Sequence, residues 1–581
     1  MTDKNRMEAS GAPVLCTERP MARAGDDERT GPTIVASACR ARWHLVGVAV
    51  ILATSAWFRL AHLDAGSLIH DEAWRANICY GFYGGTAYTP RRLPPLQSGA
   101  GWLIQHTLGR TELAMRLPSA LCGIGCVLLA YLFTRRHLDR GAALAAAAVV
   151  GFHPLLVTYS RQAKGFSLEA LAAVALLWVG VEVCRRRSSR AIFGFAIVAV
   201  VAMGFTFTAS LVIAAWMPIL AVAVLWHGPA DGRLRRSLAA VVMILMLAGG
   251  AWYVWLSGCP VGDMAREHPA FVHMWPKSYG LLTLGTWMVS RTDGILRFVL
   301  GTSVVWSPLK WFIGMAGFLA LVASAGTLWK RCRPACLFAA LLTLEVFVVG
   351  ALRLWPIGEL RTMAFLIPLF AIAVGCGLQQ FVRRMGLSPA TIVIFACCVF
   401  VPAVRATKAT LLPPPLEQHT RPVFAYTAEH LQPDDTIFIH YEMRDSYGFY
   451  WRDTGHPTLL QPYDCRDNVS RFAEVFDAWI AEHRRVWFVF MLRRPSETEL
   501  WIEHLEKHYR ILDQHRYNDA ATFLIERRLG PKKTFASFRT GLGHPTHNRA
   551  RRRTSGRSMH SLNQGPSVYR VRFCGTSSSR T

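Results

Sequence analysis

Long apolar blocks separated by polar loops run through residues 43–406 and constrain the fold more than any other feature of the sequence. A helix of about 19 residues crosses the roughly 30 Å hydrocarbon core of a membrane. Helix is the expected structure, because lipid offers no hydrogen bonds to an open backbone. The blocks lie at 43–61, 117–134, 141–158, 167–184, 191–207, 208–226, 238–257, 311–329, 335–352, 362–380 and 390–406, and 191–226 could also be one broken span. The pattern predicts an α-helical polytopic membrane protein with about 11 transmembrane helices.

The composition agrees with this fold class and excludes others. Only 18% of the 581 residues are charged, compared with about 25% in soluble proteins, which excludes a single soluble domain, a disordered chain and a coiled coil. The net charge of +26 is concentrated in residues 531–581, with eleven basic and no acidic residues, and in short loops. No nucleic-acid-binding motif is present. The fourteen cysteines form no CxxC pair, so neither a disulfide scaffold nor a zinc site is expected.

The basic loops predict the orientation of the chain. Fifteen Lys and Arg residues lie in alternate short loops, at 135–140, 185–190, 227–237, 330–334 and 381–389, and the opposite short loops carry far fewer. The positive-inside rule assigns the richer set to the cytoplasm. We therefore expect a multi-pass protein of the cell inner (plasma) membrane, with a cytoplasmic amino terminus and an extracytoplasmic carboxyl-terminal domain.

Four regions follow from this reading. We expect a disordered cytoplasmic segment at 1–41, a transmembrane domain at 42–406 with outer loops at 62–116 and 258–310, an extracytoplasmic α/β domain at 407–530 and a basic disordered tail at 531–581. Within the α/β domain, strands are predicted at 436–441 and 486–492, and amphipathic helices at 468–485 and 496–509. Deleting the tail is expected to leave insertion and activity intact.

The outer loops carry charges that membrane topology does not explain. Asp71 and Glu72 follow the first span, Arg161 and Lys164 lie between the third and fourth spans, and Arg361 precedes the tenth. An acidic pair and several cations at one membrane depth fit a site for an anionic, membrane-held substrate. Other interpretations remain open.

Asp71 could cap a surface helix that begins at Glu72, since Asp is a favoured N-cap residue. Arg59 and Arg116, at the ends of spans, could extend their guanidinium groups to the lipid headgroups. Glu345 lies within an apolar block, where a carboxylate is costly unless it is paired or functional.

Five segments, in order, resemble glycosyltransferase family 39 and its bacterial relatives of the C superfamily, which include protein O-mannosyltransferases and the lipid A aminoarabinose transferase. The segments are RLAHLDAGSLIHDEA (59–73), LPPL (93–96), LGRTELAMRLPSALCG (108–123), YSRQAKGFSLE (159–169) and WPIGELR (355–361). The departures from the family pattern are Leu93 for His, Gly165 for Pro and Phe166 for Tyr.

The resemblance implies inverting transfer of a hexose or pentose from a polyprenyl-phosphate donor to an acceptor hydroxyl at the outer membrane face. It implies that Asp71 accepts the proton of that hydroxyl or orients it, and that Glu72 positions the acceptor or a neighbouring cation. It implies that Arg161, Lys164, Arg361 and, less directly, Arg59 bind the donor phosphate. The acceptor would be a glycan, lipid or protein. No metal ligand set is predicted, and a divalent-cation requirement is left open.

Two other classes of function compete with this reading. A membrane transporter or flippase of lipid-linked or small substrates would also have many spans, although such proteins often show an internal repeat, and we find none. A receptor or scaffold that works through the outer α/β domain is the third possibility. Activity loss in an Asp71→Asn variant would favour the transferase.

Overall fold

A computed structural model describes residues 31–80, 93–225, 232–257, 274–300, 307–357, 361–387, 419–451, 455–461, 469–492, 495–517 and 519–528. The chain divides into two compact units, residues 1–50 and 51–581, and the features below lie in the second. The predicted tail at 531–581, most of the amino-terminal segment and the predicted span at 390–406 lie outside the described residues.

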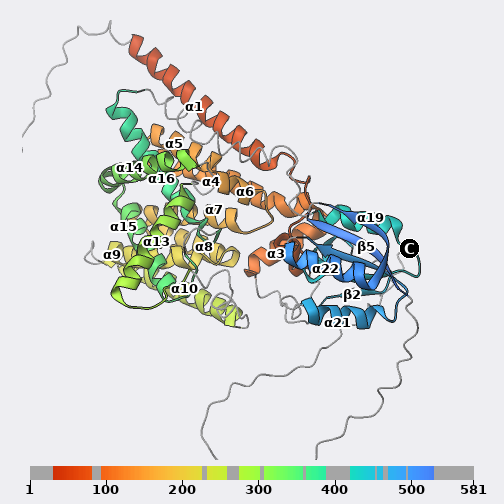
Figure 1. Ribbon diagram of the computed structural model, residues 1–581. Coiled ribbons are helices and arrows are strands. Elements are labelled where there is room, and N and C mark those ends of the chain that lie inside the picture. Colours follow the sequence, from red (N-terminus) through yellow and green to blue (C-terminus); the bar gives the residue numbers. More distant parts are fainter. Residues whose placement is uncertain are drawn as a thin grey trace, which may run out of the picture. The chain divides into compact units, whose positions relative to one another are not determined.

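Helices make up almost all of the described residues up to residue 387 (Figure 1). They are α1 (Gly31–Leu60), α2 (His70–Tyr80), α3 (Pro95–Thr107), α4 (Glu112–His137), α5 (Arg140–Phe152), α6 (Pro154–Ser160), α7 (Phe166–Arg186), α8 (Ser189–Phe205), α9 (Ala209–Leu225), α10 (Gly232–Ser257), α13 (Leu281–Val299), α14 (Ser307–Arg331), α15 (Arg333–Ala351), the 3₁₀ helix η3 (Arg361–Met363) and α16 (Leu366–Arg384).

The membrane-spanning character of these helices follows from their length and hydropathy. Five described helices, α4, α7, α10, α15 and α16, are long and apolar enough to cross a bilayer. A sixth crossing results if α5 and α6 form one span, bent by 57° where Pro154 interrupts the helix. The apolar parts of α1, α8 and α9 are shorter. The 191–226 segment forms two helices, and the number of eleven crossings stays a prediction.

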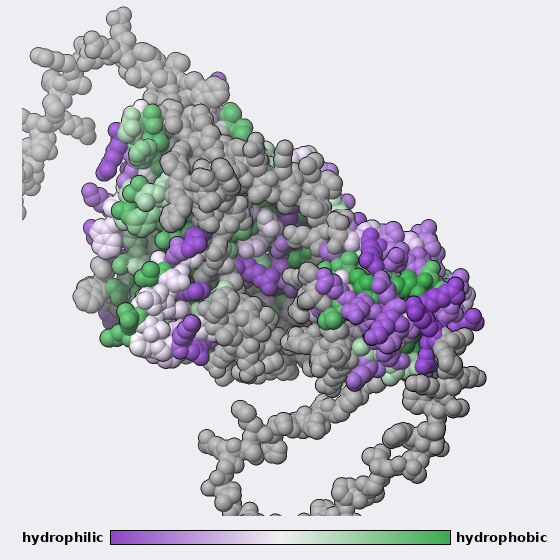
Figure 2. All heavy atoms as spheres, in the orientation of Figure 1, coloured by the Kyte–Doolittle hydropathy of each residue, from purple (hydrophilic) through white to green (hydrophobic). Residues whose placement is uncertain are grey.

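Exposed hydrophobic side chains on the long helices fit contact with lipid. Leu121, Met246, Leu247 and Leu344 are all more than half exposed, an arrangement that water would disfavour and hydrocarbon permits. In Figure 2, hydrophobic residues are prominent over the helices, and hydrophilic residues dominate the surface of the carboxyl-terminal domain.

Small residues bring the central helices close together. Every residue of α5 from Gly141 to Phe152 is buried, and this helix is rich in alanine. A Cβ atom at Gly375 of α16 would lie 2.7 Å from the backbone nitrogen of Ala146 in α5, so only glycine permits this approach. Such small-residue contacts are typical of helix packing in membranes.

The carboxyl-terminal domain contains a five-stranded mixed sheet in the order β2-β1-β3-β5-β4. Strands β1 (Thr436–Ile439), β2 (Thr458–Leu460) and β3 (Arg485–Met491) are parallel, with Ile437 opposite both Thr458 and Trp487. Strand β5 (Ala520–Arg527) runs antiparallel to β3 and to β4 (Tyr509–Arg516). Both predicted strands are present.

Helices cover both faces of this sheet (Figure 1). Phe476 of α21 (Val469–Ile480) and Trp501 of α22 (Pro495–His508) pack with Phe438 and Phe488 on one face. The helices α19 (Thr420–His430) and α20 (Arg444–Tyr450), with the 3₁₀ helix η4 (Tyr441–Met443), pack with Ile437 and Val489 on the other face. The two predicted amphipathic helices therefore cover one face of the sheet. Because successive side chains of a strand point to opposite faces, each face of the sheet has its own hydrophobic core.

Candidate active site

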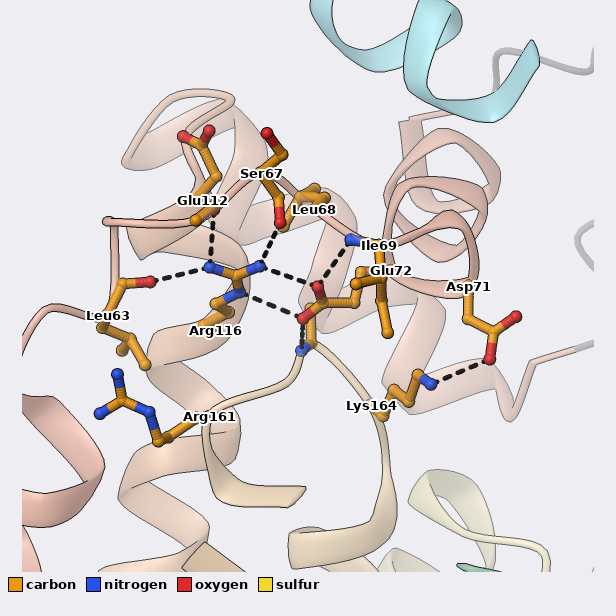
Figure 3. A network of polar contacts seen from close by, with 12 residues as sticks. Leu63, Ser67, Leu68, Ile69, Asp71, Glu72, Glu112, Arg116, Arg161 and Lys164 are labelled. Carbon is orange, nitrogen blue, oxygen red and sulfur yellow. Dashed lines mark hydrogen bonds and ion pairs between the residues drawn. The ribbon is translucent and has the colours of Figure 1, made fainter. Parts of the chain in front are cut away.

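The loop after α1 is held by a single buried arginine from α4. Arg116 Nη1 donates to the carbonyl oxygens of Leu63 and Gly66 at 3.1 and 2.9 Å, and Nη2 donates to that of Ser67 at 2.7 Å. The same guanidinium binds both carboxylate oxygens of Glu72, from Nε at 3.1 Å and from Nη2 at 2.9 Å. Figure 3 shows Arg116 at the centre of this network. The expected extension of Arg116 to the headgroups is therefore wrong, because its side chain is only 10% exposed.

Glu72 also fixes the first turn of α2 and its contact with the α6–α7 loop. Its Oε2 accepts from the backbone N–H of Ile69 at 3.0 Å, the reciprocal half of a capping box. Its Oε1 accepts from the backbone N–H of Ala163. Helix α2 begins at His70, so the prediction that Asp71 is an N-cap residue is wrong. Glu72 is fully engaged with protein groups and is 1% exposed.

Asp71 points to a different set of partners. Its Oδ2 accepts from Lys164 Nζ and from Arg361 Nη1, both at 2.9 Å. The side chain of Lys164 is buried, while those of Asp71 and Arg361 are 41% and 49% exposed. Burial alone would raise the pKa of Asp71, but Lys164 and Arg361 outweigh it and hold this pKa far below its ordinary value. The carboxylate is therefore ionised at all physiological pH values.

A tight turn between α6 and α7 directs Lys164 toward Asp71. Within the turn, the backbone N–H of Lys164 donates to Gln162 O at 2.7 Å, and Ser119 Oγ of α4 donates to Lys164 O at 2.8 Å. The guanidinium of Arg361, at the start of η3, lies 5.9 Å from the ring centroid of Phe166, the first residue of α7. Three separate segments thus bring Asp71, Lys164 and Arg361 together.

The structure does not bring the other two predicted cations to Asp71. Arg161 donates to the carbonyl oxygens of Phe58 and Ala61 at 3.0 and 2.6 Å and to that of His62 at 3.3 Å, so it caps the carboxyl end of α1. Figure 3 shows Arg161 and Lys164 pointing in opposite directions from the same turn.

Arg59 is completely buried between helices. It donates to the carbonyl oxygens of Ser55, Val150 and Gly151 and to the hydroxyls of Ser55 and Ser160. The expectation that it extends to the headgroups is wrong, because its guanidinium is buried and donates to carbonyl groups of α5.

Two charged residues that the sequence motifs did not single out lie in the helices that carry the site, α2 and α7. Arg75 lies one turn after Asp71 in α2, and Glu169 lies in the first turn of α7. Burial lowers the pKa of Arg75, while the carboxylates of Glu169 and Asp71 raise it and Arg361 lowers it further. The i, i+4 spacing of Asp71 and Arg75 was the available signal.

The carboxyl-terminal domain contacts the helix that carries Asp71. His70 Nδ1 lies 3.2 Å from Asp445 Oδ2, and Asn77 Nδ2 donates to Asp445 O at 2.6 Å. Tyr450 in α20 donates from its hydroxyl to Glu112 Oε1 at 3.0 Å and accepts from the backbone N–H of Leu68 at 2.6 Å. These contacts put the α/β domain on the same side of the helices as Asp71.

In the part of the chain that the structure describes, no group of side chains forms a set of metal ligands. Over those ranges, no three His, Cys, Asp or Glu side chains are grouped closely enough to hold an ion.

The helical region and the carboxyl-terminal domain together have a fold that is also found in solved membrane protein structures. Two structures of ArnT from Cupriavidus metallidurans are similar to it. The one bound to undecaprenyl phosphate aligns with a TM-score of 0.53 and 15% identity over 83% of this chain and 98% of ArnT. The apo structure gives a TM-score of 0.54 and 14% identity over 84% of this chain and 98% of ArnT.

A comparison with models of protein families shows which family part of the sequence resembles. A model of the dolichyl-phosphate-mannose-protein mannosyltransferase family matches residues 93–255, which confirms the resemblance predicted from the motifs. No curated protein sequence matches the chain. The family match and the fold together indicate a membrane glycosyltransferase.

Proposed function

We propose that the protein transfers a hexose or pentose from a polyprenyl-phosphate donor to an acceptor hydroxyl at the outer face of the membrane, with inversion at the anomeric carbon. The observation that carries the proposal is the convergence of Lys164 and Arg361 on one carboxylate oxygen of Asp71. Two cations and one carboxylate leave a single net positive charge, which suits one phosphodiester anion. The undecaprenyl phosphate bound by ArnT is a related lipid phosphate, the monoester that remains when the sugar is absent.

In our proposal the two carboxylate oxygens of Asp71 have different roles, one in ion pairing and one in binding the acceptor. Both ion pairs end on Oδ2, and Oδ1 accepts no hydrogen bond from another described residue. With 41% of the side chain exposed, Oδ1 is available to an incoming hydroxyl. Asp71 orients this hydroxyl for attack opposite the phosphate. Its low pKa makes it a weak base, so it takes the proton late, as the new bond forms.

The two cations act on the leaving group. The acceptor oxygen forms a bond to the anomeric carbon while the bond from that carbon to the phosphate oxygen breaks. The electron pair of the broken bond stays with the polyprenyl phosphate, and Lys164 and Arg361 stabilise the additional negative charge. The proton passes from the hydroxyl to Asp71 and then to solvent.

Glu72, Arg116, Arg161 and Arg59 serve this site indirectly in our proposal. The Glu72–Arg116 pair fixes the start of α2 and, through Ala163, the turn that carries Lys164. Arg161 and Arg59 join α1 to the helices around it. These residues position the reacting groups and do not contact the phosphate.

The basic loops support an outer location for Asp71 and for the α/β domain, with the amino terminus in the cytoplasm. Because α20 contacts α2, the acceptor would reach Asp71 along the boundary between the membrane helices and the α/β domain.

A transfer assay with matched variants tests the proposal. Proteoliposomes with wild type, Asp71→Asn or Asp64→Asn receive a panel of radiolabelled undecaprenyl-phosphate sugars and membranes from cells that lack the protein as the acceptor source. Asp64 is an exposed acid in the same loop. We expect Asp71→Asn to reduce transfer at least about 100-fold and Asp64→Asn to leave it unchanged. Equal transfer by all three proteins contradicts the role of Asp71. Movement of labelled lipid across the vesicles without transfer would instead support a flippase.

A further inference from the structure

Glu169 is an acidic residue in the first turn of a membrane-spanning helix, and the mechanism above does not use it. It lies three residues after Phe166, where α7 begins, and its backbone N–H donates to Gly165 O at 2.9 Å. Carboxylates within membrane helices are costly and usually functional. It lies next to the turn that carries Lys164, a residue of the proposed donor site.

Arg75 links Glu169 to Asp71. Asp71 and Arg75 are four residues apart and therefore lie on the same face of α2. Both Glu169 and Asp71 act electrostatically on the guanidinium of Arg75, as does Arg361. Arg75 thus interacts electrostatically with two carboxylates, one on α2 and one on α7, and with Arg361.

The carboxylate of Glu169 is incompletely bonded. Its Oε2 is buried and has no hydrogen-bond partner among the described residues. A buried acceptor without a donor is destabilising, and in native proteins a missing donor is commonly a ligand or water. Glu72 provides the contrast, because both of its oxygens receive hydrogen bonds from Arg116 and from backbone N–H groups. Glu72 has the bonding of a structural carboxylate, and Glu169 does not.

The missing partner must be a hydrogen-bond donor. A phosphodiester has only acceptor oxygens and is repelled by a carboxylate, so the donor phosphate does not qualify. The acceptor hydroxyl is assigned to Asp71, whose side chain is open to solvent. Glu169 lies in the first turn of the helix that follows Lys164, and in our proposal the group attached to the phosphate reaches this turn. In the proposed substrate this group is a sugar, and its hydroxyls are hydrogen-bond donors.

We propose that Glu169 accepts a hydrogen bond from a hydroxyl of the sugar on the lipid-phosphate donor. This inference rests on the proposed function. It makes Glu169 a determinant of which sugar is used, because a sugar without a correctly placed hydroxyl leaves the buried carboxylate unpaired.

Comparing the affinities for two lipids, one with and one without the sugar, distinguishes recognition of the sugar from recognition of the phosphate. Purified full-length protein is titrated with undecaprenyl phosphate, which lacks the sugar, and with the panel member that the wild type binds most tightly. The variants are Glu169→Met, which removes the acceptor at similar volume, and Glu169→Gln, which keeps one acceptor oxygen. Glu182→Gln changes a carboxylate at the other end of α7 that is paired with Arg136 and Arg186, and it serves as the control.

We expect Glu169→Met to weaken binding of the sugar-bearing lipid about tenfold while binding of undecaprenyl phosphate stays unchanged. Glu169→Gln should fall between Glu169→Met and wild type, and Glu182→Gln should match wild type. Unchanged binding of the bare lipid shows in the same experiment that the variants are folded. Equal weakening of both lipids, or no weakening of either, overturns the assignment.

Lys164→Met tests the underlying function separately. It should weaken binding of both lipids, because both carry a phosphate group. If wild type and Lys164→Met bind undecaprenyl phosphate equally well, the proposed donor site is wrong and the inference about Glu169 falls with it. If Lys164→Met weakens both lipids but Glu169→Met weakens neither, only the inference about Glu169 is wrong.

Discussion

Asp71 and Glu72 are neighbours in the sequence, but their carboxylates bind different cations in different environments. Asp71 pairs with Lys164 and Arg361 at a partly exposed position, while Glu72 pairs with buried Arg116. Consecutive residues of a helix point about 100° apart, so one residue can face the site and the next the protein interior. The acidic pair therefore divides into the carboxylate that we propose reacts, Asp71, and a structural one, Glu72.

This division predicts opposite effects of two conservative variants. Glu72→Gln leaves the charge of Arg116 buried without its counterion, and we expect a loss of about 3 kcal/mol or more in the free energy of unfolding. Asp71→Asn removes partly exposed ion pairs and should cost about 1 kcal/mol or less, although it abolishes most of the transfer activity. Thermal unfolding in detergent, compared with transfer rates, checks both. A strongly destabilised Asp71→Asn with a stable Glu72→Gln would contradict the assignment.

The charge on Lys164 predicts the alkaline limit of activity. Burial lowers the pKa of Lys164 below its ordinary value, and Asp71 only partly restores it. As the pH rises, Lys164 thus loses its proton below the usual lysine pKa of about 10.4, and phosphate binding weakens. Asp71 has a lowered pKa and stays ionised well below about pH 4, so it contributes no acidic limb at neutral pH.

A pH–rate profile of Lys164→Arg measures this effect. Arginine stays protonated throughout, so the alkaline limb should move upward even if the maximal rate falls. The comparison with wild type uses the same lipid and the same acceptor. An alkaline limb at the same pH in both proteins would show that another group titrates there.

Arg161 and Lys164 should differ when each is replaced by glutamine. Lys164→Gln removes a cation from Asp71 and should raise the donor KM at least about tenfold, with little change in melting temperature. Arg161→Gln removes a helix cap from α1 and should lower stability by about 1 kcal/mol, with an unchanged donor KM. Donor titrations and melting curves of the two variants distinguish these outcomes. A raised donor KM in Arg161→Gln would restore this residue to the phosphate site.

The sequence motifs predicted which segments meet at the site, but not which of the predicted cations contact Asp71. Arg161 and Lys164 are three residues apart, and the turn at 161–165 sends them in opposite directions. That turn depends on Ser119 and Glu72, which are distant in sequence. Arg59 could equally have pointed outward, because the carbonyl groups that it binds at Val150 and Gly151 belong to another helix. Side-chain direction was therefore set by tertiary contacts that no local pattern contains.

The fold was predicted best where periodicity is strong. The apolar blocks at 167–184 and 335–352 correspond to α7 and α15 within a few residues. The block at 141–158 bends at Pro154, a break that the proline itself signals. Strand β4 was missed because it is an edge strand with exposed charged residues such as Arg510 and Arg516, and this pattern resembles a loop or a helix surface.

The hydroxyl of Tyr450 predicts a coupling between the α/β domain and α2. Tyr450→Phe removes the donor to Glu112 and leaves the backbone N–H of Leu68 without its acceptor, which should cost about 1–3 kcal/mol. We expect faster hydrogen exchange in residues 67–80 and lower transfer activity. Tyr426→Phe, which removes a hydrogen bond to Asp513 within the α/β domain, is the control. Unchanged exchange in Tyr450→Phe would mean that the contact does not order α2.

Two glycines in α4 give a test of the buried site of Arg59. A Cβ atom at Gly123 would clash with Ser160 Oγ and lie 2.8 Å from Arg59 Nε, whereas at Gly125 the nearest atom is Leu171 Cδ1 at 3.7 Å. Gly123→Ala should therefore destabilise the protein by about 1–3 kcal/mol. Gly125→Ala should be neutral or stabilise it by up to about 1 kcal/mol, because alanine favours helix. Melting temperatures of the two variants in the same detergent check this. Similar stability of both would show that Ser160 and Arg59 can move aside, and that the hydrogen bonds of Arg59 do not hold α1 against α4 and α6.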